Sequence, residues 1–125
     1  MAAPNVANTA TLTLKVSKGT IGTSMATAVN NAASSNLAIK IISLYVANVD
    51  GTNAADVTVS VFDQDDVGGT GTAIASTVSI PADSTVVIID ENSPIYLEED
   101  MSLGVQASVA GDLVYVASYQ EINDA

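Results

Sequence analysis

The chain has 125 residues, the size of a single domain, and it contains no cysteine and no histidine. This composition leaves no thiol or histidine-activated nucleophile and no nitrogen or sulfur ligand for zinc, so we expect no catalytic residue, no metal site and no bound cofactor. The net charge of −11 repels phosphate backbones and anionic lipids, so neither a nucleic acid nor a membrane surface is an expected partner.

Residues 1–9 are small and polar and include Pro4, which predicts a flexible N-terminal arm ahead of a single β-sandwich domain at residues 10–125. The arm has neither a basic region nor an apolar run, so we do not expect a signal peptide, and we expect a soluble protein. Such an arm can add a strand to the sheet edge of a neighbouring protein. Its candidate contact residues are Ala3, Pro4, Asn5 and Val6.

The first strand is predicted at residues 11–16, where apolar and polar residues alternate strictly. Its apolar residues, which are expected to face the core, are Leu12, Leu14 and Val16. Lys15 is expected on the solvent side. A weaker strand is predicted at residues 20–27, and residues 29–36 are rich in turn formers and are predicted to form a loop.

The longest apolar segment, residues 37–49, predicts a central strand. Apolar side chains fall on both of its faces, so we expect one face to meet the opposite sheet and the other to be covered by something else, such as a neighbouring subunit. Asp50-Gly51 follows this segment and is a strong signal for a hairpin turn. The returning strand is predicted at residues 57–62, where valine occupies every second position.

Residues 63–71 predict a polar loop whose three glycines prevent regular structure. Asp63, Asp65 and Asp66 resemble the front half of a calcium loop, because oxygen ligands on alternate residues suit that ion. The glutamate that completes an EF-hand loop is missing, since the twelfth position holds Ile74. A calcium loop and a solvated acidic loop tip are both open interpretations, and the missing glutamate favours the loop tip.

The stretch at residues 78–105 has the clearest succession of strands and turns and is predicted to be a rigid hairpin framework. The strands predicted in and around it lie at residues 72–80, 85–89, 95–97 and 102–109. The carboxylates at residues 98–100, with Tyr96 beside them, could hydrolyse or bind a sugar. A single tyrosine offers little aromatic surface for a sugar to stack on, so the favoured interpretation is a turn that keeps its charges in water.

The last strand is predicted at residues 113–122, with Leu113, Tyr115, Ala117 and Tyr119 on one face. Tyr115 and Tyr119 are candidates for a protein contact between subunits. Turn signals recur about every 8 to 12 residues, which is typical of sandwiches. The sequence therefore predicts an all-β fold, an antiparallel β-sandwich of about eight strands of the jelly-roll or Greek-key type.

Several segments resemble small virion structural proteins of tailed bacteriophages. They are Ile80-Pro-Ala-Asp-Ser-Thr85, Pro94-Ile-Tyr-Leu-Glu-Glu-Asp100, Leu103-Gly-Val-Gln-Ala-Ser108, Ile42-Ser-Leu-Tyr-Val-Ala-Asn48 and Gly111-Asp-Leu-Val-Tyr-Val-Ala-Ser-Tyr-Gln-Glu-Ile122. The resemblance covers residues 37–122 and is a pattern of strands and turns without a catalytic signature.

This resemblance implies a non-enzymatic capsid decoration, or cement, protein. Such a protein is made in the host cytoplasm and binds the outer capsid surface of the virion as a homotrimer, where it clamps neighbouring subunits of the major capsid protein. The alternative is a component of the tail, neck or fibre, or a module that binds a receptor or a glycan.

Overall fold

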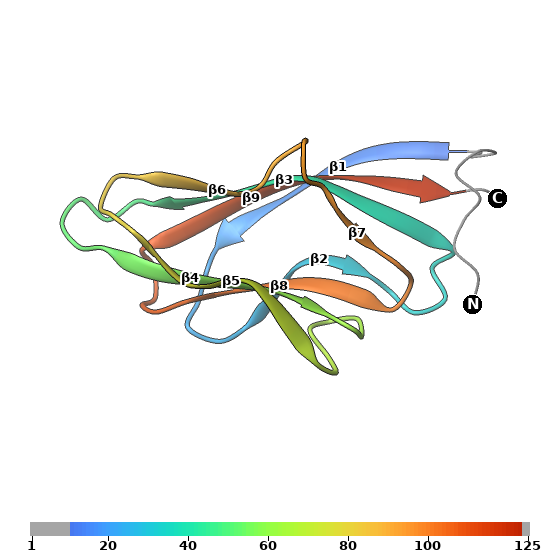
Figure 1. Cartoon of the computed structure of the whole chain (residues 1–125), viewed down its shortest axis with the longest axis horizontal. Coiled ribbons are helices and arrows are strands. Elements are labelled where there is room, and N and C mark those ends of the chain that lie inside the picture. The colour runs from blue at the N-terminus through green and yellow to red at the C-terminus, as the bar shows by residue number, and fades with distance from the viewer. Residues whose placement is uncertain (1–10, 124–125) are drawn as a thin grey trace.

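The computed structural model describes residues 11–123, which form nine strands in two sheets packed face to face (Figure 1). Sheet A has the strand order β1 (Thr11–Thr20), β9 (Leu113–Asn123), β3 (Leu37–Asn48) and β6 (Thr85–Ile89), and the short β7 (Ile95–Leu97) also pairs with β3. Sheet B has the order β2 (Ala26–Asn31), β8 (Met101–Ala107), β4 (Ala55–Phe62) and β5 (Gly71–Ile80). Residues 11–123 contain no helix, and therefore none that could cross a membrane.

The strand pairs are antiparallel and follow the order of a long hairpin rolled up on itself. β1 pairs with β9, β2 with β8, β3 with β6 and β7, and β4 with β5. β6 and β7 pair with successive parts of β3, so together they take the place of one interrupted strand. Two such four-stranded layers make a jelly roll. The predicted antiparallel β-sandwich of about eight strands is confirmed.

The core lies between the two sheets and is built almost entirely from aliphatic side chains, which suit a pleated surface. Its largest fully buried members are Ile21, Ile39, Ile41, Leu44, Ile80, Leu97, Leu103 and Leu113. The central strand predicted at residues 37–49 is confirmed, because β3 has β9 on one side and both β6 and β7 on the other.

Two buried asparagines tie the sheets together at the two ends of β3. Asn31 closes β2 in sheet B, and its Nδ2 donates to the carbonyl oxygens of Leu37 at 2.9 Å and Leu97 at 3.1 Å, both in sheet A. Asn48 closes β3 in sheet A, and its Nδ2 donates to the carbonyl oxygen of Ile80, in sheet B, at 2.9 Å. Each amide thus satisfies backbone groups of the opposite layer that would otherwise be buried without partners.

The hairpin predicted at Asp50-Gly51 is wrong, because the strands on either side of this turn belong to different sheets. The Asp50 N–H donates to Asn48 Oδ1 at 2.9 Å, and the Asp50 carboxylate accepts the N–H groups of Thr52 and Asn53. The turn therefore carries the chain from sheet A to sheet B. The hairpin framework predicted at residues 78–105 is wrong for the same reason, since β5 and β8 lie in sheet B and β6 and β7 in sheet A.

The strand predicted at residues 20–27 is also wrong, because residues 21–25 cross between the sheets. The Ile21 N–H donates to the Leu113 carbonyl at 2.8 Å, and the Ala107 N–H donates to the Gly22 carbonyl at 2.9 Å. The next strand, β2, takes in part of the predicted loop, which is confined to residues 32–36. Pairing with β8 makes a strand from alanines and asparagines whose own strand propensity is low.

Candidate interaction surface

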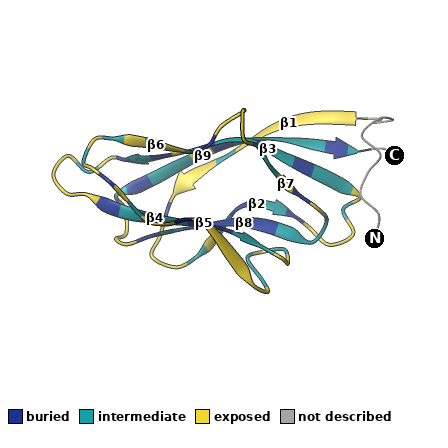
Figure 2. Cartoon of the chain, in the orientation of Figure 1, coloured by how far each residue is buried: buried dark blue, intermediate teal, exposed yellow. Residues whose placement is uncertain are grey.

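β1 is an edge strand whose apolar side chains point away from the core, so the prediction that they face inward is wrong. Leu12, Leu14 and Val16 are 57%, 72% and 62% exposed, and Figure 2 shows β1 exposed over most of its length. The register explains this: Ser17 lies opposite the buried Ala117 of β9, and directly opposite residues of an antiparallel pair share a face. The three apolar residues have the other parity and lie on the outer face of sheet A.

Side chains from the other strands of sheet A extend this apolar surface. Tyr45 of β3 lies opposite Val116 of β9 and Val87 of β6, and Tyr96 of β7 lies opposite Lys40 of β3. The exposed apolar residues of this face form what we call the apolar patch: Leu12, Leu14, Val16, Tyr45, Val87, Tyr96 and Val116. Each of them is between 40% and 72% exposed.

The size of the apolar patch is typical of a protein–protein contact. Fully exposed aromatic side chains offer about 150–250 Å² and aliphatic ones less, so the seven residues expose roughly 600 Å². The largest apolar patch of a monomer is about 300–600 Å², and a standard interface buries about 800 Å² on each partner. The area of the patch is therefore at the upper end of the range for monomers, and it approaches the area that one partner buries in a standard interface.

The outer face of sheet A differs in charge from the rest of the chain. No strand residue that points to this face within residues 11–123 is a carboxylate, although the chain has fourteen aspartates and glutamates. Of the described strand residues only Asp56, in sheet B, and Glu121 are acidic, and Glu121 lies opposite the buried Ile39 and pairs with Lys15 at 3.4 Å. Lys18 and Lys40 lie on the outer face. This face is thus apolar and weakly positive.

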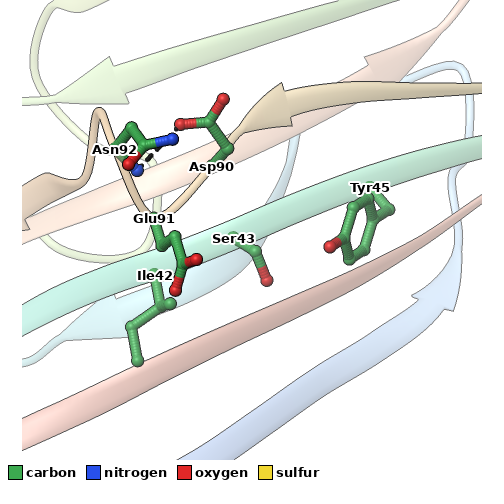
Figure 3. Close-up of a pocket in the computed structure, with 6 residues that line it drawn as sticks. All are labelled: Ile42, Ser43, Tyr45, Asp90, Glu91 and Asn92. Carbon is green, nitrogen blue, oxygen red and sulfur yellow. Dashed lines mark hydrogen bonds between the residues drawn. The ribbon is translucent and has the colours of Figure 1, made fainter.

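The connection between β6 and β7 places two carboxylates at the edge of this face. It folds back over β3, and Asp90, Glu91 and Asn92 line a hollow of about 360 Å³ together with Ser43 and Tyr45 (Figure 3). The Asp90 carboxylate accepts the Asn92 N–H at 2.9 Å, which fixes the turn. In Figure 3 the Glu91 side chain reaches over β3 beside Ile42, and Tyr45 of the apolar patch lines the same hollow, so the Glu91 charge lies at the edge of the patch.

The two tyrosines predicted as contact residues lie on the inner side of β9. Tyr115 and Tyr119 are partly buried and pack against the core, and the Tyr115 hydroxyl shares a hydrogen bond of 3.1 Å with Ser17 Oγ. Tyr115 also lines a hollow of about 390 Å³ with Lys18 and Val116, at the edge between β1 and β9. The other predicted contact residues, Ala3, Pro4, Asn5 and Val6, lie outside the described residues.

The aspartates of the loop at residues 63–71 bind backbone groups. Asp63 Oδ1 accepts the Thr70 N–H at 2.7 Å, and Asp65 Oδ2 accepts the Ala33 N–H at 3.2 Å. Among the described residues, no group of three or more acidic side chains is arranged to hold a metal ion. These carboxylates shape the loop and attach it to the neighbouring connection.

The acidic corner at residues 98–100 is more buried than predicted. Asp100 Oδ1 accepts the Asp65 N–H at 3.0 Å. Both carboxylate oxygens of Glu99 are shielded from water and have no hydrogen-bond partner among the described residues, whereas Glu98 is exposed. The prediction that this corner keeps its charges in water is therefore wrong for Glu99, and a buried unpaired carboxylate is unfavourable.

Two further aspartates meet at the end of the sandwich where β3 enters its turn. Burial raises the pKa of Asp112, and the negative charge of Asp50 and a hydrogen bond with its side chain raise it further. The backbone joins the same two connections, since the Val49 N–H donates to the Asp112 carbonyl at 2.8 Å. The ends of the sandwich are thus acidic, in contrast to the outer face of sheet A.

Sequence reasoning did not identify the apolar patch as a site, although one signal pointed to it. The apolar residues on both faces of segment 37–49 indicated that something must cover the second face. The strict alternation at residues 11–16 showed that β1 has an apolar side. It could not show which side meets the core.

No protein-family model matches the sequence, and no curated protein is significantly similar to it. Solved structures share its fold. A chain of the Bacillus endospore appendages, described as disulfide-linked pili, is 14% identical over 92% of this chain and 88% of that chain, with a TM-score of 0.53. A chain of the acid-stable capsid of the Helicobacter pylori bacteriophage KHP30 is 9% identical over 94% of this chain and 91% of that chain, with a TM-score of 0.52. At such low identity the likeness establishes a shared β-sandwich fold.

Proposed function

We propose that this chain is a non-enzymatic structural protein of a bacteriophage virion, and that it decorates the outside of the capsid. In this role it assembles as a homotrimer and clamps neighbouring subunits of the major capsid protein. The observation that carries the proposal is the apolar patch on the outer face of sheet A, because a surface of this size and charge fits a protein neighbour. The fold shared with a chain of a bacteriophage capsid is consistent with it.

The physical properties of the domain suit a cement protein. A net charge of −11 keeps the free subunit soluble and repels the packaged nucleic acid, so contacts are restricted to suitable protein surfaces. Several weak contacts made at once raise the overall affinity by roughly 10² to 10⁴, so a trimer needs only a modest contact from each subunit. The N-terminal arm is the proposed site of one such contact, through Ala3 to Val6, and Tyr115 contributes through the hollow that it lines at the edge between β1 and β9.

The test is to add the purified chain to shells assembled without it from the major capsid protein of the same virus. Binding to the outer surface, at positions where capsid subunits adjoin, and a higher melting temperature of the shell are the expected results. Deletion of residues 2–9 is expected to weaken this binding, and equal binding would remove the arm from the proposal. The decoration role would be overturned if the chain did not bind the shells, or if images of the virion located it in the tail.

The alternative is a component of a tail, neck or fibre. The observation that favours it is the fold shared with a chain of the Bacillus endospore pili. This alternative predicts that the purified chain polymerises into linear filaments, which electron microscopy would show directly. Closed oligomers of fixed size favour decoration instead.

A further inference from the structure

We infer that the apolar patch is covered by a second copy of this chain, with the β1 side of one copy against the β6–β7 side of the next. This inference deepens the proposed function by naming the surface of self-association, and it rests on that function only for the number of copies. It is carried by the distribution of charge and by the area of the patch.

The charges on the outer face of sheet A are complementary between its two edges. Lys18 lies on β1 at one edge, and Glu91 lies in the β6–β7 connection at the other. Glu91 lies over β3, two strand spacings of about 4.8 Å from β1, so the two residues are at least about 10 Å apart across the sheet in one chain. Lys18 makes no ion pair with the residues that the structure describes. A second copy can supply the carboxylate that the first cannot.

The apolar residues divide in the same way. Leu12, Leu14 and Val16 lie on β1, while Val87 and Tyr96 lie on β6 and β7. In a closed ring each copy places its β1 half against one neighbour and its β6–β7 half against the other, so the roughly 600 Å² patch of every copy is covered over two contacts. Each contact alone is small, and the ring compensates because every copy is held twice. Tyrosine is among the residues that most often supply binding energy in such contacts.

A second copy fits this face better than it fits the ends of the sandwich. Eleven of the thirteen acidic residues within 11–123 lie in the connections between strands, so copies that meet end to end would bring carboxylates together. Like charges placed against each other across an interface are unfavourable by several kcal/mol. The outer face of sheet A avoids this cost, and contact between its two different edges can close into a ring.

The test is a charge reversal followed by sedimentation analysis of the self-association constant. Lys18→Glu and Glu91→Lys should each raise the dissociation constant about ten-fold, because each sets like charges against each other. The double variant Lys18→Glu/Glu91→Lys restores opposite charges across the contact and should return close to the natural value. The mismatched double variant Lys18→Glu/Asp56→Lys has the same net charge and places the new lysine on sheet B, away from the contact, so it should stay weak.

A second arm of the test addresses the apolar contact. Leu14→Ser removes the most exposed leucine of the patch and should weaken self-association about ten-fold while the free chain keeps its circular dichroism spectrum. Val109→Ser, which alters an exposed valine outside the patch, should leave self-association unchanged.

The outcomes separate this inference from the proposed function. A natural chain that stays monomeric at every concentration, or equal weakening by both double variants, overturns the inference even if the chain binds capsid shells. Complexes of two or three times the chain mass of 12.6 kDa that respond to the charge reversal support it. If these complexes do not bind capsid shells, the decoration role is overturned, but the inferred self-association surface is still supported.

Discussion

Replacing Asn48 by alanine tests whether a buried amide holds the two sheets together at one end of the sandwich. The side chain is 2% exposed. Its Nδ2 donates to the carbonyl oxygens of Asn53 and Ile80, both at 2.9 Å, and its Oδ1 accepts the Asp50 N–H at 2.9 Å. Alanine would leave three backbone groups without these partners.

The expected loss follows from these three hydrogen bonds. Each contributes about 1 kcal/mol net, so Asn48→Ala should lower the free energy of unfolding by about 3 kcal/mol. For a domain of this length, 1 kcal/mol corresponds to about 4 °C, so the melting temperature should fall by about 12 °C. This loss is a large part of the 5–15 kcal/mol that usually stabilises a domain.

The assay is urea unfolding followed by circular dichroism, together with thermal melting, at one protein concentration because self-association would shift both. Asn92→Ala is the control, since Asn92 lies in an exposed connection where its backbone N–H, not its amide, makes the hydrogen bond to Asp90. The control should change stability by less than about 0.5 kcal/mol. An Asn48→Ala chain that melts within a few degrees of the natural chain would refute the view that this amide joins the sheets.

Three further variants test other features of the fold. Glu99→Gln should raise the free energy of unfolding by about 1 kcal/mol more than Glu98→Gln in urea titrations. Both variants remove one charge, but Glu98 is exposed, whereas the carboxylate oxygens of Glu99 are buried and have no hydrogen-bond partner within residues 11–123. Equal gains would contradict this. Asp112→Asn should raise the melting temperature at pH 7, and the gain should vanish near pH 3, where the carboxyl is protonated in folded and unfolded chains alike. The direction of this pH dependence follows from the raised pKa of Asp112, because a raised carboxyl pKa means that stability is lost as the pH rises through the folded-state pKa. A gain that persists at low pH would have another cause. Gly104→Ala should cost about 1–3 kcal/mol in the same titrations, because its Cβ would lie 2.7 Å from Val67 and 2.8 Å from Met25 Sδ, whereas Gly22→Ala, with open space around the Cβ, should cost little.

The strands of this fold were predictable where the pattern was continuous or long. β3 and β9 are long and carry apolar residues on both parities, and β6 is a run of valine and isoleucine between polar turns. Such segments fit few structures other than strands. β2 was missed because its asparagine and alanine residues become a strand only through pairing with β8.

The arrangement of the strands depended on information that local sequence does not carry. Asp50-Gly51 turns the chain as predicted by its residue types, yet the chain crosses to the other sheet, because the two strands that it joins pair with β9 and β8 and not with each other. For β1, alternation defined two faces, and the register with β9 decided that the face with Leu14 points outward. The burial of Glu99 likewise depends on tertiary packing.

The distribution of charge over the surface favours the apolar patch as the place where copies of the chain meet. At physiological ionic strength the repulsion between exposed charges is screened beyond about 8 Å, so the net charge of −11 acts mainly when copies come close. Two copies that approach each other through their connections bring carboxylates together, whereas two copies that approach through sheet A bring apolar side chains and lysines together. Added salt weakens the repulsion between carboxylates more than it weakens the burial of apolar area, because that burial does not depend on charge. Self-association through sheet A should therefore survive added salt, and dissociation in salt would mean that ion pairs alone hold the copies together.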